Sequence, residues 1–111
     1  MIALSRERPE AKGEPVMPTY IRLASLTEQG IRNIHNLRHM LDESRLIMEQ
    51  HGVKLVHGWA TLGEYDVVAV IEAADAKTAA KVSALIAARG HFRATTLSAV
   101  PLAELTDAVE Q

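Results

Sequence analysis

Two strand-like runs lie on either side of a short turn in the middle of the chain, and they constrain the fold more than any other feature. Residues 53–61 (VKLVHGWAT) alternate at period two, which is the side-chain period of a β-strand. Residues 66–73 (DVVAVIEA) are mostly β-branched or small and apolar on both sides, as in a strand inside a sheet. The sequence LGEY between them supplies a turn, so we expect the two strands to pair as neighbours.

The part of the chain before this hairpin predicts one strand followed by one helix. Residues 19–25 (TYIRLAS) alternate between an apolar and a mixed face. Thr27 is a candidate N-cap for the helix and Gly52 a C-terminal stop, whereas the weak helix formers Asn33 and Asn36 predict irregular first turns. The expected core stripe of this helix consists of Ile34, Leu37, Leu41, Ser44 and Met48, flanked by Met40 and Ile47.

The part of the chain after the hairpin predicts a second helix, a fourth strand and a short terminal helix. Asp75 caps the alanine-rich run AKTAAKVSALIAAR, which Gly90 ends. Residues 91–100 (HFRATTLSAV) form the fourth strand. After Pro101, residues 102–111 (LAELTDAVEQ) are patterned as an amphipathic helix.

The resulting order β-α-β-β-α-β predicts a ferredoxin-like α+β fold, in which a four-stranded antiparallel sheet carries both helices on one face. The other face of the sheet is then bare. A bare face with apolar residues usually marks a partner or ligand surface, so we expect a homo-oligomer that associates through its sheets. The residues assigned to the bare face are Tyr20, Arg22, His57, Trp59, Val68, Val70, Thr96 and Ser98.

Length and composition indicate one soluble domain and exclude several classes of protein. The 111 residues suit a single core, and we expect residues 1–16, rich in Arg, Glu, Pro and Gly, to be a flexible tail before a domain at residues 17–111. No apolar run is long enough for a membrane span, and the formal net charge of −2 gives no attraction for nucleic acid. The absence of cysteine favours the cytoplasm.

Three segments resemble the GYD-domain family, small bacterial and archaeal domains named for a Gly-x-Tyr-Asp-like turn. They are residues 17–34 (MPTYIRLASLTEQGIRNI), residues 61–75 (TLGEYDVVAVIEAAD) with Gly63, Tyr65 and Asp66 as the signature, and residues 93–100 (RATTLSAV). The resemblance implies a ferredoxin-like unit of the kind that pairs into dimeric α+β barrels, with Met17 as the usual starting methionine. It implies little chemistry, and residues 33–44 (NIHNLRHMLDES) depart from the family pattern.

The signature residues have a catalytic and a structural interpretation. Tyr65 offers a phenol that can stabilise an oxyanion, and Asp66 offers a carboxylate that serves as a general base if burial raises its pKa. In the structural interpretation Gly63 adopts a turn conformation closed to other residues, Tyr65 packs over a helix end, and Asp66 accepts backbone N–H groups of the turn. We favour the structural interpretation, since no ligand is needed to explain these residue types.

His57 and Trp59 are candidates for a cavity together with Tyr20 and Arg22, provided that the strand registers agree. Arg22 would pair a carboxylate and His57 would move protons, so the cavity would take a small anionic or aromatic molecule. The alternative is that Trp59 and His57 belong to a subunit interface. Arg93 fits either interpretation.

The spacing of His35 and His39 on the first helix allows two imidazoles to share a metal ion. The expected core stripe, however, places both on nearly the opposite side of the helix, and no third ligand stands out, so a solvated face is favoured over a metal site. The sequence has no phosphate-binding glycine loop, nucleophile elbow, dinucleotide fingerprint or zinc spacing. It therefore predicts no cofactor.

Two functions remain open at this point. The first, which we prefer, is a homo-oligomeric assembly or small-ligand-binding module whose sheets pack face to face. The second is a cofactor-independent isomerase, decarboxylase or monooxygenase-like enzyme that would use His57, Tyr65, Asp66 and Arg22 for proton transfer. The second rests partly on analogy of fold, which is a weak basis for function.

Overall fold

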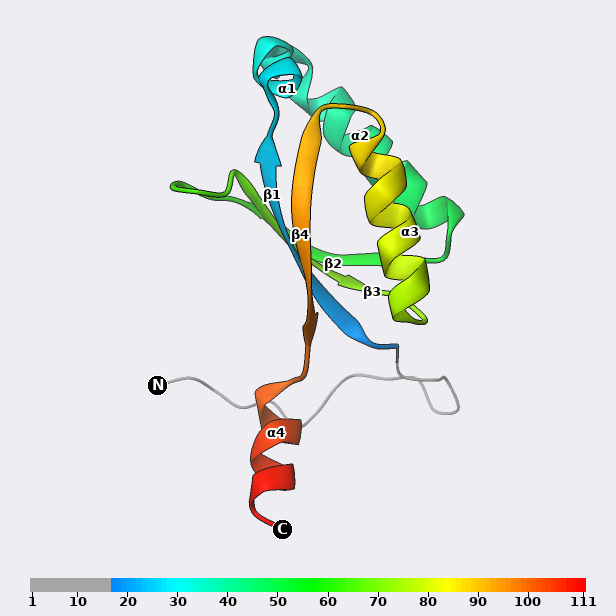
Figure 1. The fold of residues 1–111 in the computed structure, drawn as a ribbon, viewed down its shortest axis with the longest axis vertical. Coiled ribbons are helices and arrows are strands. Elements are labelled where there is room, and N and C mark those ends of the chain that lie inside the picture. The colour runs from blue at the N-terminus through cyan, green and yellow to red at the C-terminus, as the bar shows by residue number, and fades with distance from the viewer. Residues whose placement is uncertain (1–16) are drawn as a thin grey trace.

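The computed structural model describes residues 17–111, and the tail predicted for residues 1–16 lies outside them. The elements of the described part follow the predicted order, including the terminal helix, and only the first helix is divided (Figure 1). In chain order they are β1 (Thr19–Leu26), α1 (Glu28–Arg32), the 3₁₀ turn η1 (Ile34–Asn36), α2 (Leu37–Gln50), β2 (Lys54–Ala60), β3 (Val67–Glu72), α3 (Ala76–Ala87), β4 (Phe92–Ala99) and α4 (Leu102–Val109).

Local chemistry sets the ends of the helices. The Thr27 hydroxyl accepts the Gly30 amide at the start of α1, and the Asp75 carboxylate accepts the Thr78 amide at the start of α3, so both predicted caps are confirmed. The irregular first turns are confirmed too, because the chain breaks at Asn33 and again at Asn36 before α2 begins. Side chains at these positions compete with the helical backbone for hydrogen bonds.

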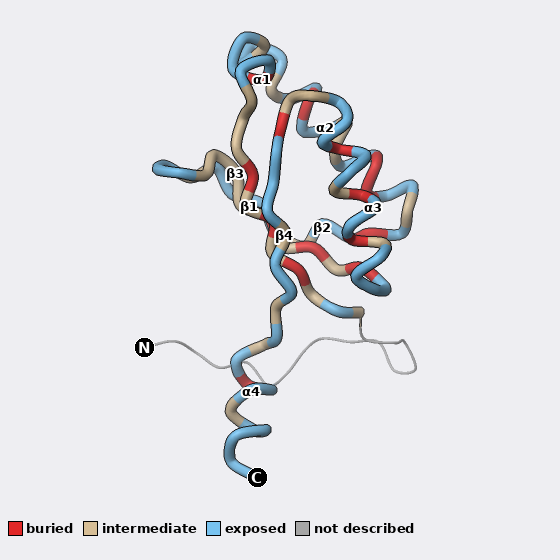
Figure 2. The backbone as a smooth tube through the Cα atoms, in the orientation of Figure 1, coloured by how far each residue is buried: buried red, intermediate tan, exposed pale blue. Residues whose placement is uncertain are grey.

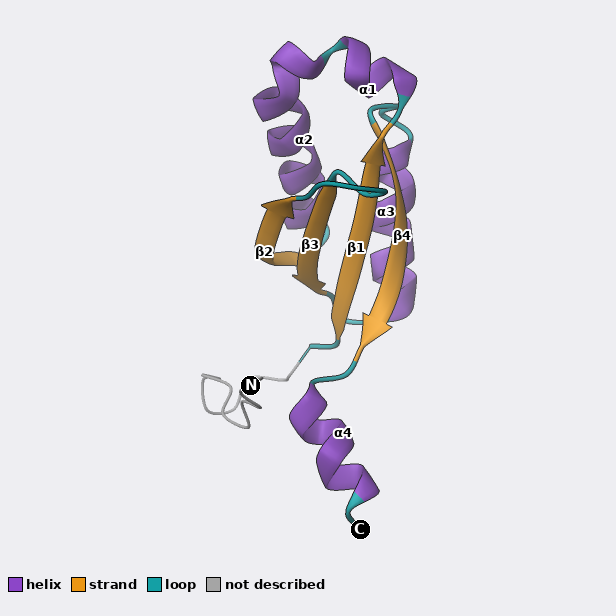
Figure 3. Cartoon of the chain, turned by 90° about the vertical axis from the view of Figure 1, so that its left-hand side faces the viewer, coloured by secondary structure: helices purple, strands orange, loops and turns teal. Residues whose placement is uncertain are grey.

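The four strands form one antiparallel sheet in the order β2-β3-β1-β4. Both long helices, α2 and α3, lie behind the same face of this sheet in Figure 3, and the other face is open toward the viewer. The predicted ferredoxin-like α+β fold is therefore confirmed. The core lies between sheet and helices (Figure 2), and its main cluster consists of Tyr20, Ile47, Met48, Val53, Ile71, Ala73, Ala79, Val82 and Ile86.

The assignment of Tyr20 and Arg22 to the open face was wrong. Arg22 is opposite Ala69, and Tyr20 is opposite the fully buried Ile71, so both point toward the helices. The same register places Thr96 beside Arg22 and Ser98 beside Tyr20, which corrects these two residues as well. Because strand residues alternate between faces, Ile21 and Leu23 of β1 lie on the open face instead.

A β-bulge explains why β2 also departs from a simple alternation. Leu55 pairs with Ile71 on the helix-covered face, but the next paired residue is His57, which pairs with Val70 on the open face. Val56 is the extra residue. A shift of one residue moves every following side chain to the other face, so His57 and Trp59 lie on the open face with Val68 and Val70, as predicted, but without Tyr20 and Arg22.

The core stripe of the first helix was only partly predicted. The buried residues of α2 are Met40, Ile47 and Met48, whereas Leu41 and Ile34 are partly exposed to solvent. The break at residues 33–36 restarts the helix with a new orientation. The predicted stripe assumed one continuous helix from Ile34 to Met48. Because the helix is interrupted, that set of residues does not coincide with the buried side of α2.

Candidate functional site

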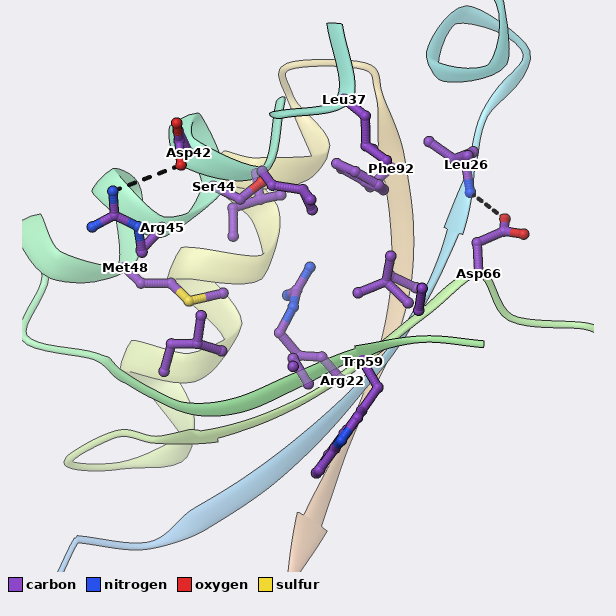
Figure 4. Close-up of a pocket in the computed structure, with 18 residues that line it drawn as sticks. Arg22, Leu26, Leu37, Asp42, Ser44, Arg45, Met48, Trp59, Asp66 and Phe92 are labelled. Atoms are coloured by element: carbon purple, nitrogen blue, oxygen red, sulfur yellow. Dashed lines mark hydrogen bonds and ion pairs between the residues drawn. The ribbon is translucent and has the colours of Figure 1, made fainter. Parts of the chain in front are cut away.

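An apolar cavity of about 390 Å³ lies between α2 and the helix-covered face of the sheet. Its mouth lies between α2 and β2, since Leu41, Arg45 and Leu55 line the cavity and are also exposed to solvent. This volume falls within the range of roughly 300–1,000 Å³ that is typical of small-ligand pockets. Apolar side chains form most of the wall (Figure 4), among them Leu26, Leu37, Met48, Val67, Ile86 and Phe92.

Arg22 lies at the floor of this cavity. Its guanidinium group points from β1 into the space between the sheet and α2 in Figure 4, and the residue is only 5% exposed. Nη1 donates a hydrogen bond to Ser83 Oγ of α3, and Ser83 Oγ in turn shares a hydrogen bond of 2.9 Å with Thr96 Oγ1 of β4. The Ser83 hydroxyl thus fixes the position of the arginine, and Thr96 fixes that of Ser83.

The charge of Arg22 has no partner of opposite sign in the described part of the chain. Within residues 17–111, no carboxylate lies within ion-pair distance of its guanidinium. Burial lowers the pKa of Arg22 from its ordinary value, yet an arginine side chain keeps its proton in proteins. The cavity therefore has a buried positive charge at the end of an apolar wall.

The other charged groups that line the cavity are already engaged. Arg45 at the mouth pairs with Glu49 at 2.8 Å and lies 3.7 Å from Asp42. The carboxylate of Asp66 accepts the Leu26 amide at 2.8 Å (Figure 4). Arg22 and Arg45 differ in this respect, because only Arg45 is compensated.

The Gly-x-Tyr-Asp turn closes the β2–β3 hairpin and ties it to β1. Gly63 has φ of +104°, a conformation that side-chain-bearing residues rarely adopt. The Thr61 hydroxyl donates to the carbonyl of the half-buried Tyr65 at 2.6 Å, and the Thr61 amide donates to the Asp66 carbonyl. Asp66 accepts the amide of Leu26 in β1, not an amide of the turn, and its own amide donates to Ala24.

The three candidate catalytic residues do not surround one cavity. Asp66 lines the cavity under α2, and His57 and Tyr65 do not. His57 lies across the sheet on the open face, with its ring stacked on Trp59 at a centroid distance of 5.4 Å. Trp59 is among the residues that line the cavity, but its ring leaves β2 on the side away from the Arg22 guanidinium in Figure 4. Arg93 of β4 is exposed and also lies on the open face, opposite Ser25.

His35 and His39 are both exposed, on η1 and α2 respectively. Among residues 17–111 the structure shows no group of three or more His, Cys, Asp or Glu side chains that could hold a metal ion. The same residues contain no helix with the length and apolarity needed to cross a bilayer.

Sequence reasoning missed Ser83, which accepts the hydrogen bond of Arg22, and missed that Thr96 bonds to Ser83. A signal for Ser83 is present in the sequence: it follows Ala79 by four residues and precedes Ile86 by three, which places it beside the buried stripe of α3. No comparable signal marks Thr96, since its role depends on the pairing of β4 with β1.

The fold and the Gly63-to-Asp66 turn define a small ferredoxin-like α+β domain with a structural signature turn. The family model described as the GYD domain matches residues 20–109. The chain belongs to the GYD-domain family, as the resemblance of its sequence segments implied. No solved structure matches the chain significantly.

One relative has a curated description. It is the protein of Thermus thermophilus named glutamine synthetase and cystathionine beta-lyase binding protein, and it is 38% identical to this chain over 90 residues. The aligned region covers 80% of this chain and 95% of the relative. The similarity thus extends over nearly the whole length of the relative.

Proposed function

We propose that this protein is a homo-oligomeric binding and assembly module in which the open faces of two sheets pack against each other, as in a dimeric α+β barrel. The observation that carries the proposal is the composition of the open face. It presents six apolar side chains from all four strands, namely Ile21, Leu23, Trp59, Val68, Val70 and Leu97.

The exposure of these side chains supports an interface. Trp59 is 52% exposed and Leu97 is 44% exposed. A contiguous apolar surface rimmed by polar groups marks an association site more often than a free surface, and tryptophan is enriched where interfaces are strongest. His57, stacked on Trp59, and Arg93 provide polar groups near the margin.

The β2–β3 hairpin enlarges this surface. Its turn projects away from the helices, beyond the open face of the sheet (Figure 1). Leu62 in this turn is 100% exposed. A stable interface buries about 800 Å² on each partner, and a second copy under the hairpin would cover Leu62 together with the sheet.

The family relationship supports protein partners besides a second copy. The Thermus thermophilus relative is named as the binding protein of two enzymes, and we extend a role in binding other proteins to this chain. The absence of cysteine agrees with a cytoplasmic setting for such a role.

Light scattering coupled to size-exclusion chromatography at micromolar concentration tests the self-association. We expect a dimer or a higher oligomer for the unaltered chain, and a monomer for Leu23→Glu, because each copy would then bury an unpaired carboxylate in an apolar interface. Leu46→Glu on α2 is the matched control, since Leu46 is 51% exposed and lies outside the sheet. A monomeric unaltered chain would contradict the proposal.

A further inference from the structure

We propose that the cavity between α2 and the sheet binds a small monocarboxylate with an apolar body, with its carboxylate on Arg22 and its apolar part against α2 and Phe92. This site lies on the opposite side of the sheet from the association surface. The inference is therefore independent of the proposed oligomer.

Charge complementarity is the first argument. A buried charge is costly unless it is paired, and the cost is lowest when a partner of opposite sign completes its hydrogen bonds. The Ser83 hydroxyl accepts a hydrogen bond from Arg22 Nη1, but it carries no charge. Among residues 17–111 no acidic side chain compensates the charge of Arg22. A bound anion would therefore complete the site.

The geometry of Arg22 favours a carboxylate. The planar fork of a guanidinium matches the two oxygens of a carboxylate. Ser83 of α3, itself hydrogen-bonded to Thr96 of β4, holds one nitrogen of the fork in place, which reduces the entropy lost on binding. The group points into the cavity and not along the sheet (Figure 4).

The surroundings favour a single negative charge over two. Among the described residues that line the cavity, Arg22 is the one cation without an acidic partner, because Arg45 pairs with Glu49 and Asp42. A phosphate monoester near neutral pH carries up to two charges, and the second would be buried without a partner. A monocarboxylate brings the single negative charge that compensates Arg22.

The rest of the wall favours an apolar body of metabolite size. Leu37, Met48, Ile86 and Phe92 face the cavity from three different elements. The volume of about 390 Å³ is near the lower end of the range for ligand pockets. It suits a molecule with a short aliphatic chain or one aromatic ring, and it is too small for a polymer.

Isothermal titration calorimetry with octanoate and phenylacetate tests the site, with 1-octanol and inorganic phosphate as controls of charge and shape. We expect saturable binding of at least one carboxylate to the unaltered chain. Arg22→Met should weaken that binding by about tenfold or more, as for loss of a charged hydrogen bond, and should leave 1-octanol unaffected. Arg93→Met, on the opposite face, is the matched control and should bind the carboxylates normally.

Three results would overturn the inference: no saturable binding of either carboxylate, equal binding by Arg22→Met, or phosphate binding as tight as that of the carboxylates. If Arg22→Met does not fold, nuclear magnetic resonance of the unaltered chain tests the same contact. In the unaltered chain, octanoate or phenylacetate should shift the Nε–Hε signal of Arg22 and leave that of Arg93 in place. Leu23→Glu should bind the same carboxylates even when it is monomeric, which separates this proposal from the oligomer.

Discussion

On the helix-covered face of the sheet Arg22 is buried among apolar side chains, whereas on the open face Trp59 is half exposed to solvent. The same four strands supply both faces, and adjacent residues of β1 belong to opposite ones. From residue type alone, Arg22 would be expected at the surface and Trp59 in the core. In this sheet the two positions are reversed. Within residues 17–111, the covered face encloses a charge without an acidic partner, and the open face exposes apolar side chains.

The largest effect on stability is expected in β3, where one residue belongs to the core and its neighbour belongs to the proposed interface. Ile71 is fully buried, so Ile71→Ala should lower the free energy of unfolding by about 2–5 kcal/mol at any protein concentration. Its neighbour Val70 lies on the open face, and Val70→Ala should cost less than about 1 kcal/mol for dilute protein. Urea denaturation measures both. Association should make the Val70→Ala effect grow with concentration, and a concentration-independent loss as large as that of Ile71→Ala would contradict the distinction between the faces.

The next effect concerns Asp66, at the edge where the cavity meets the hairpin. Asp66→Ala should lower the free energy of unfolding by about 1–3 kcal/mol, because the Leu26 amide loses its acceptor. Asp66→Asn should recover most of that loss, since an amide oxygen also accepts a hydrogen bond. Glu64→Gln in the same exposed turn is the control. If Asp66→Ala were as stable as the unaltered chain in urea, the structural interpretation of the signature aspartate would fail.

A smaller effect is expected at Gly63, in the hairpin that extends the open face. Gly63→Ala forces a side chain into a left-handed conformation, which costs about 1 kcal/mol or somewhat more. Gly58→Ala in β2 is the control, since a Cβ there meets no atom within 4 Å. Thermal unfolding should show a lower midpoint for Gly63→Ala only. Equal midpoints for the two variants would show that the turn does not need glycine.

The smallest effect is a pH dependence at the surface of the helical layer. Hydrogen bonds from the Thr78 side chain and backbone lower the pKa of Asp75 from 3.8. A lowered pKa in the folded state means that Asp75 stabilises the protein above its unfolded pKa and loses this contribution as the pH falls through the folded value. Asp75→Asn should therefore flatten the acid limb of a stability-against-pH curve. An acid limb identical to that of the unaltered chain would contradict the role of Asp75 as a charged cap.

The fold was predictable because each element carries its own local signal. Period-two runs, the caps Thr27 and Asp75, and the glycine-centred turn at Gly63 all depend on residues close in sequence. The break of the first helix was predictable for the same reason. Local signals of this kind agree with one another in a foldable sequence.

The candidate site was less predictable because it depends on register between distant strands. Residues 19–25 of β1 offer Tyr20, Arg22 and Ala24 on one side and Ile21 and Leu23 on the other, and hydrophobicity alone favours the second set for the core. The pairing of β1 with β3, however, places Tyr20, Arg22 and Ala24 on the helix-covered face. The bulge at Val56 then places the side chains of His57 and Trp59 on the face opposite Arg22, and simple alternation along the strand does not predict it.

The bulge also governs how the two faces can be labelled chemically. Before Val56, the even-numbered Lys54 lies on the open face, and after it the odd-numbered His57 and Trp59 do. Since the natural chain contains no cysteine, a single thiol introduced at position 57 would carry a spectroscopic reporter on the open face alone, and one at position 55 would carry it at the mouth of the cavity. Deletion of Val56 would leave both labels on the same faces, because Leu55 and His57 already pair with consecutive residues of β3.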